Sequence, residues 1–141
     1  MAILIVDDFY KIIAEDELED VVGDLTGAGW ATLQDLEEDA IAEMVGYLDV
    51  RYDATKCLDS DDNTAISILK RKLIDMILYD AFALIVPNNI PDLRKERRGN
   101  AIDYLEKVAD GFIKPNFPIQ EEEPTTPLRY GSSVPKSENY Y

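Results

Sequence analysis

The sequence predicts an all-α protein, a small bundle of four to five helices followed by an extended C-terminal arm. Apolar residues recur at three- and four-residue spacing in the two longest apolar segments, which is the helical period. No segment shows convincing strand alternation, and four prolines fall between residues 118 and 141, where neither period is present. We therefore expect a helical body over residues 1–114 and an arm over residues 115–141.

The stretch VDDFYKIIAEDELEDVVGD (residues 6–24) predicts two short helices or one bent helix. Asp7 or Asp8 can cap the first turn, and Gly23 is a natural C-terminal stop. The two glycines of the following LTGAGW (residues 25–30) predict a flexible turn.

The next segment, TLQDLEEDAIAEMVGYLDVRYD (residues 32–53), predicts an amphipathic helix. Thr32 is a suitable N-cap, and Asp35 follows three residues later, where it can meet free backbone amides. Acidic residues occupy the face opposite an apolar stripe. The stripe consists of Leu33, Leu36, Ala40, Ile41, Met44, Val45, Tyr47 and Leu48, and the acidic face of Asp35, Glu38, Asp39, Glu43 and Asp49.

A polar loop (residues 53–63) precedes TAISILKRKLIDMILYDAFALIV (residues 64–86), which predicts a long helix capped by Asp62 or Asn63. The second half of this helix is apolar on nearly every side, so we expect it to be the most buried element. The last helix runs from about Pro91 to Gly111, because proline suits a first helical turn and glycine a helix end. Its predicted buried face consists of Leu93, Ala101, Leu105, Val108 and Phe112.

Charge is distributed unevenly along the chain, whose formal net charge is −15. Residues 1–63 contain 18 acidic and 3 basic residues, residues 64–114 contain 7 and 9, and residues 115–141 contain 4 and 2. The acidic first half would repel a phosphate backbone, which argues against ordinary nucleic-acid binding. Two interpretations remain: the acids keep the protein soluble, or they form a surface that lies near DNA without binding to it.

No segment is suited to a membrane or to secretion. The N-terminal MAILIV lacks a basic leader and is followed by two aspartates, so it does not read as a signal peptide. The longest apolar run is interrupted by Asp75 and Asp80 and is too short to span a bilayer. We expect a soluble protein without a membrane partner.

The sequence offers little for catalysis or metal binding. It has no histidine, and Cys57 has no nearby helper that would activate a thiol nucleophile. DSDDN (residues 59–63) resembles the start of a calcium loop, but Thr64 stands where the loop needs glycine and Lys70 where it needs glutamate. We expect a non-enzymatic protein without catalytic, metal or cofactor-binding residues. Catalysis by carboxylates alone remains an alternative.

Two basic clusters and the arm supply the candidate interface residues. The clusters can pair with acidic helices of their own chain, or with the acidic half of a neighbouring copy in a head-to-tail contact. In the arm, tyrosines can bury a large ring while keeping a polar group. The candidates are Lys70, Arg71 and Lys72; Arg94, Lys95, Arg97 and Arg98; and Arg129, Tyr130, Tyr140 and Tyr141.

Four segments occur in a recognisable order: DDFYKIIAEDELEDVVGD (residues 7–24), YLDVRYD (residues 47–53), LKRKLIDMILYDAF (residues 69–82) and RRGNAIDYLEKVADGFI (residues 97–113). In this order they resemble the tailed-phage head-tail connector proteins, in particular the Mu-like gp36 group and more distantly the HK97-type and SPP1-type connector adaptors. Within the second segment, Arg51 can tie its helix to a nearby carboxylate or contact a neighbouring subunit. Tyr47, Leu48 and Tyr52 complete the motif, and the apolar stripe places the first two in the core.

The resemblance implies a structural virion protein that is made in the host bacterial cytoplasm. Such adaptors form a ring, typically of twelve copies, beneath the portal and join it to the next neck or tail component around the DNA exit channel. DNA would then be a cargo that slides past an acidic surface. The compact members of the family stop soon after the last helix, so the arm is the segment that departs from them. The alternative is a soluble acidic binding module that mimics DNA and regulates a host protein.

Overall fold

The computed structural model describes residues 3–59 and 64–120, and in this part of the chain the fold is all-α. Six helices are present, of which two are single turns. They are α1 (Val6–Phe9), α2 (Glu15–Val22), α3 (Ala28–Leu48), α4 (Ala54–Cys57), α5 (Thr64–Ile85) and α6 (Asp92–Asp110). The two short N-terminal helices, α1 and α2, confirm one of the two predicted arrangements.

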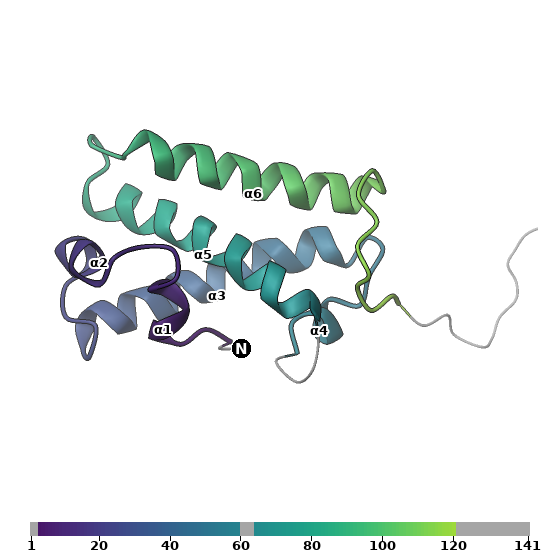
Figure 1. Cartoon of the computed structure of the whole chain (residues 1–141), viewed down its shortest axis with the longest axis horizontal. Coiled ribbons are helices and arrows are strands. Elements are labelled where there is room, and N and C mark those ends of the chain that lie inside the picture. Colours follow the sequence, from purple (N-terminus) through teal and green to yellow (C-terminus); the bar gives the residue numbers. More distant parts are fainter. Residues whose placement is uncertain (1–2, 60–63, 121–141) are drawn as a thin grey trace, which may run out of the picture.

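The three long helices α3, α5 and α6 pack against one another along the long axis of the molecule (Figure 1). A short connection joins α5 to α6 at one end of the bundle, which we call the turn end, and α2 packs against α3 and α5 there. Residues 111–120 and α4 lie at the opposite end, which we call the arm end (Figure 1). The two ends therefore expose different segments of the chain.

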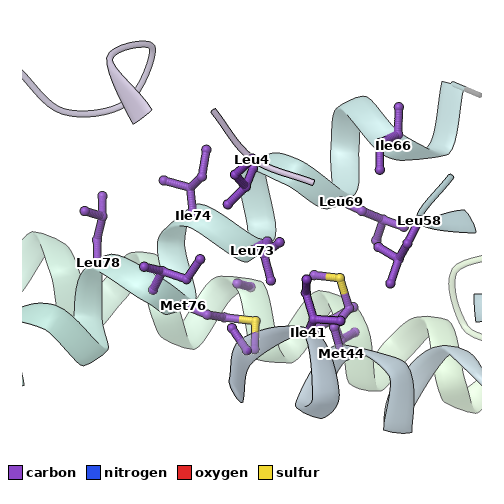
Figure 2. Packing of buried hydrophobic residues seen from close by; sticks show 14 of the residues in the cluster. Leu4, Ile41, Met44, Leu58, Ile66, Leu69, Leu73, Ile74, Met76 and Leu78 are labelled. Carbon is purple, nitrogen blue, oxygen red and sulfur yellow. The ribbon is translucent and has the colours of Figure 1, made fainter. Parts of the chain in front are cut away.

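One apolar core joins these helices, and α5 contributes most to it, as its composition predicts. Leu69, Leu73, Ile77 and Leu78 of α5 are fully buried, and Met44 of α3 packs below them (Figure 2). Figure 2 also shows Leu4, from the segment before α1, and Leu58, from the segment after α4, against the same helix. Burial of each such side chain stabilises the fold by about 1.5–3 kcal/mol before the loss of conformational entropy is counted.

The helix α3 begins at Ala28, four residues before the predicted cap at Thr32, so the predicted capping role of Thr32 and Asp35 was wrong. The predicted turn, residues 25–30, therefore contains the first three residues of α3. A Cβ at Gly29 would lie 2.7 Å from the backbone oxygens of Gly23 and Asp24, so only glycine allows the first turn of α3 to pass this close to the preceding loop. Gly29, which indicates a flexible turn in the sequence, is thus required by close packing of the backbone.

Of the two predicted caps of α1, Asp8 does cap the helix, but from its third helical position. The helix α1 begins at Val6, and the Asp8 carboxylate reaches back to accept a hydrogen bond from the Ile5 amide at 3.0 Å. Gly23 ends α2 as predicted, with a φ of 91° that favours glycine. The predicted caps of α5, Asp62 and Asn63, lie outside the described residues.

The predicted polar loop between α3 and α5 contains the short helix α4 and is packed against the core. Asp53 caps α4 by accepting a hydrogen bond from the Lys56 amide at 3.1 Å. Ala54, Cys57 and Leu58 are buried. The loop is polar in composition, but its few apolar residues all face inward.

Residues 115–120, which we expected to belong to the arm, pack on the body at the arm end. Phe117 is buried and meets Tyr52 edge to face, with ring centroids 5.6 Å apart. The Asp53 amide donates to the Pro118 carbonyl at 2.9 Å, and Ile119 forms an isolated antiparallel bridge with Tyr52. The packed body thus reaches Gln120, because an aromatic side chain anchors a segment that has no helical period.

The predicted buried face of α6 was correct at Ala101, Leu105 and Val108 but wrong at both ends. Leu93 is 52% exposed and Phe112 is 82% exposed. Arg94 takes the buried place near the start of α6, since a long arginine stem can cover apolar surface as an aliphatic side chain does. The consequence is that both ends of α6 carry a large apolar side chain in solvent.

Candidate functional site

The first basic cluster lies on the first half of α5, and two of its three members have partners within the chain. The Lys70 ammonium lies 3.5 Å from the Asp8 carboxylate, and the Lys72 ammonium lies 5.0 Å from the centre of the Tyr104 ring. Arg71 is exposed and has no ion pair among the described residues. Lys70 thus pairs with an acid of its own chain, which was one of the two predicted alternatives, whereas Arg71 remains available to a partner.

The second basic cluster lies on the first half of α6 and is also largely engaged. Arg97 Nε donates to Asp75 Oδ1 at 2.8 Å, which joins α6 to α5. Arg98 lies 3.7 Å from the Glu43 carboxylate on α3, and its guanidinium covers the Tyr79 ring at 5.2 Å. Lys95 is exposed without an ion pair among the described residues.

Arg94 differs from the other cations because it is buried. Only 5% of it is exposed, and its Nη1 has no hydrogen-bond partner in the described part of the chain. Burial lowers the pKa of Arg94, the charge of Arg97 lowers it further, and Glu17 on α2 opposes the shift. A buried cation of this kind is unsuited to direct contact with a partner, so its predicted interface role is not supported by its position.

Two hollows flank Arg71 and together form a basic face. The first, of about 350 Å³, lies between α5 and the segment around α1, and the second, of about 320 Å³, lies between α5 and α6. The charged side chains around them are five cations and two carboxylates, a net charge of +3 in a chain whose net charge is −15. We define the basic face by these cations: Lys11, Lys70, Arg71, Lys72 and Arg97.

Acidic residues form a second surface on α2. Five of the eight residues of α2 are exposed carboxylates, and none of them forms a salt bridge with a described residue. The acidic face of α3 is also exposed as predicted, although Glu43 pairs with Arg98. We call the α2 surface the acidic helix: Glu15, Asp16, Glu17, Glu19 and Asp20.

Arg51 connects the end of α3 to the end of α6. Its Nε donates to the Ala109 carbonyl at 2.8 Å and its Nη2 to the Asp110 carbonyl at 3.2 Å. These carbonyls belong to the last turn of α6, where the helix dipole favours a cation. The acceptors are backbone carbonyls, whereas the two predicted partners were a nearby carboxylate and a neighbouring subunit. The motif residues Leu48 and Tyr52 are buried, whereas Tyr47 is half-buried.

Large apolar side chains are exposed at both ends of the bundle. At the turn end, Leu84 and Ile85 close α5 and Leu93 opens α6. At the arm end, Val50 follows α3 and Phe112 and Ile119 follow α6. Figure 1 shows that these segments lie at opposite ends of the long axis. An apolar side chain that is exposed alone is common, whereas a contiguous exposed apolar patch marks a contact surface.

The described residues contain no group of three or more side chains of the types that usually hold a metal ion. Cys57 is buried, and burial raises its pKa to about 11, which disfavours the nucleophilic thiolate. Its Sγ donates to the Pro118 carbonyl at 3.7 Å, so it helps to hold residues 115–120. Within the described parts of the chain, no helix combines the length and apolar character needed to cross a membrane.

Two buried carboxylates were missed by the sequence analysis. Glu37 is 3% exposed and its Oε2 accepts hydrogen bonds from the Ile3 and Leu4 amides at 3.0 and 2.9 Å. Asp75 is the partner of Arg97. Glu37 is four residues from Leu33 and from Ile41, so the helical period places it on the apolar stripe, and this spacing was the signal that could have found it.

The predicted arm candidates Arg129, Tyr130, Tyr140 and Tyr141 lie outside the described residues.

A family described as "Bacteriophage Mu, Gp36" matches residues 5–132, which is most of the chain and extends past residue 113, where the last of the resembling segments ends. A search of curated proteins and a search of solved structures each found no match. Such membership indicates a phage structural or morphogenesis protein. The chain belongs to the Bacteriophage Mu Gp36 family.

Proposed function

We propose that this protein is a non-enzymatic head-tail connector of a tailed phage. In this role, copies form a ring beneath the portal, and the ring joins the portal to the next neck or tail component around the DNA exit channel. The observation that carries the proposal is the family match over residues 5–132. A ring of twelve copies follows from the resemblance to connector adaptors, and the virion head-tail interface is the proposed location.

The two apolar ends of the bundle support a joining role. A connector must contact one component above it and another below it, and a rod-like bundle can do so through its opposite ends. Leu84, Ile85 and Leu93 at the turn end are separated by the length of the bundle from Phe112 and Ile119 at the arm end (Figure 1). Apolar patches with polar surroundings are typical of protein contact sites.

The charge distribution supports the proposed relationship with DNA. The exposed acids of α2 and α3 lie on a chain of net charge −15, so packaged DNA would be repelled and not held. We expect no retention of double-stranded DNA in a filter-binding assay at low salt, where electrostatic attraction would be strongest.

Electron microscopy of the purified protein mixed with the portal of its phage tests the proposal. We expect a ring of added density on the portal axis. The double variant Leu93→Asp/Phe112→Asp, which places a charge at each apolar end, should reduce this density while circular dichroism shows an unchanged helix content. Absence of portal binding by the unaltered chain under all conditions would refute the proposed function.

The acidic helix also favours a second candidate, a soluble binding module that mimics DNA charge and captures a basic DNA-binding protein. Five carboxylates in eight residues present a dense negative row without salt bridges to the described residues. A gel-shift competition distinguishes the two functions. The mimic would release DNA from a basic host protein, whereas a connector would leave that complex intact and would bind the portal.

A further inference from the structure

We propose that the acidic helix of one copy docks on the basic face of a second copy. This inference deepens the proposed function by naming the surfaces through which neighbouring copies meet. Only the closure of these contacts into a ring depends on the proposed function. The partner is therefore a second copy of this chain, presented through Glu15, Asp16, Glu17, Glu19 and Asp20.

The basic face is built before a partner arrives. Asp8 holds Lys70 at 3.5 Å, Asp75 holds Arg97 at 2.8 Å, and the Tyr104 ring lies under Lys72. These contacts fix the cations around the two hollows, which reduces the entropy lost when a partner binds. Arg71 lines both hollows, and neither Arg71 nor Lys11 has an ion pair with a described residue.

Apolar side chains accompany the cations, so the face suits a protein surface better than a small inorganic ion. Ile12, Ile66 and Ile74 line the first hollow, and Ile68, which is 41% exposed, lines the second. An interface that combines apolar contact with charge pairing gains affinity from the first and orientation from the second. The exposed carboxylates of the acidic helix supply the charge pairing.

Charge complementarity selects the acidic helix as the occupant. Nucleic acid is a poor occupant because the field of the whole chain, with a net charge of −15, repels phosphates. Like charges at three- and four-residue spacing destabilise a helix. The buried Arg94 attracts Glu17, but α2 has no salt bridge among the described residues. On α3, in contrast, Glu43 already pairs with Arg98.

The two surfaces consist of different residues, so the contact is head to tail. The acidic helix lies at the turn end, whereas the basic face covers the first half of α5, Lys11 in the segment after α1, and Arg97 of α6 (Figure 1). Each copy therefore offers both surfaces at once. Repetition of such a contact produces a ring when the rotation closes and a filament when it does not.

Sedimentation velocity of the full chain tests the contact over a concentration series at low and high salt. We expect self-association that weakens with salt. Arg71→Glu, in the basic face, and Asp20→Lys, in the acidic helix, should each weaken it by about tenfold or more, since each turns an attraction into a repulsion. Lys95→Glu makes the same charge change at an exposed cation outside the basic face and should leave association unchanged.

A mixing experiment tests the head-to-tail geometry. Arg71→Glu keeps an intact acidic helix and Asp20→Lys keeps an intact basic face, so an equimolar mixture should form heterodimers and nothing larger. Failure of the mixture to associate, an equal effect of Lys95→Glu, or a chain that is monomeric throughout would each overturn the proposed contact. Loss of association on deletion of residues 121–141, without any effect of Asp20→Lys, would also overturn it and assign the arm as the occupant.

The outcome is separable from that of the proposed function. A monomeric chain that still forms a ring on the portal overturns the contact between free copies and leaves the connector function standing. A chain that associates as described but does not bind the portal refutes the function and leaves the contact standing.

Discussion

The Glu37 carboxylate holds the Leu4 backbone, because its Oε2 accepts the Leu4 amide at 2.9 Å while Leu4 itself is buried in the core. The same oxygen accepts the Ile3 amide at 3.0 Å. One acidic side chain thus fixes the segment that leads into α1. Figure 2 shows Leu4 against α5.

Glu37→Ala should therefore lower the free energy of unfolding by about 2–4 kcal/mol, because it removes two hydrogen bonds to a charged group and leaves buried amides unpaired. Urea unfolding followed by circular dichroism measures the change. Glu38→Ala, at the exposed neighbouring position, is the control and should change stability by no more than about 0.5 kcal/mol. Equal effects of the two variants would show that Glu37 does not fix the N-terminal segment.

Gly111→Ala should destabilise the fold by about 1–2 kcal/mol. Gly111 has a φ of 87°, and a Cβ there would lie 3.0 Å from the Arg51 guanidinium, which bonds the last turn of α6. Gly46→Ala is a matched control in the interior of α3, where a Cβ meets nothing within 4 Å. It should raise stability by about 0.5–1 kcal/mol. Thermal unfolding of both variants checks the opposite signs.

Two truncations should have different effects on stability. Removal of residues 121–141 leaves the Phe117–Tyr52 contact in place, so the free energy of unfolding should not change measurably. Removal of residues 115–141 deletes the buried Phe117 ring and should cost about 3 kcal/mol while the helices remain. Phe117→Ala in the full chain should reproduce most of that loss. Equal stability of the two truncated chains would contradict the packing of residues 115–120.

Cys57 should be almost unreactive in the folded protein. With a pKa of about 11, its thiolate fraction at pH 7.5 is on the order of 0.03%, and the side chain is buried. A thiol probe should react slowly in buffer and rapidly in urea. Rapid reaction in buffer would mean that α4 opens without global unfolding.

Asp80→Asn should raise stability at pH 7 by about 0.5 kcal/mol, a small effect because the carboxyl is partly exposed. Burial raises the pKa of Asp80, Glu43 and Asp39 raise it further, and Arg98 opposes them. An acid whose folded pKa lies above its unfolded value stabilises the fold at low pH. That stability is lost as the pH rises from about 3.8 through the folded pKa. The advantage of the variant should therefore vanish at pH 3.5, as urea unfolding at both pH values would show.

Periodic apolar patterns, with Pro91 and Gly111 as boundaries of the last helix, were sufficient to predict α5, α6 and most of α3. The start of α3 was not predictable because Gly29 reads as a turn residue, whereas its actual constraint is the backbone of Gly23 and Asp24 at 2.7 Å. That constraint exists only in three dimensions. Leu93 was expected to be buried and Arg94 exposed, but the structure shows the reverse. Arginine counts as a polar residue in a sequence pattern, although its aliphatic stem can cover apolar surface.

The candidate site was predictable as a set of charges but not as a surface. The sequence indicates the basic clusters, yet only the fold shows that Lys70 and Arg98 meet acids of the first half while Arg71 does not. Lys11 is far from the clusters in sequence and joins the basic face because the segment after α1 lies beside α5. Pairing partners that are distant in the chain cannot be assigned from local spacing.

The packing of residues 115–120 also fixes a tether point. Gln120 donates to the Asp49 carbonyl, so the remaining 21 residues start from one place at the arm end. A chain of that length spans at most about 70 Å, which limits how far Tyr141 can lie from Gln120. A binding site that lies beyond this distance from Gln120 cannot contact Tyr141 of the same chain. The buried ring of Phe117 thus sets the reach of every contact that the last tyrosines can make.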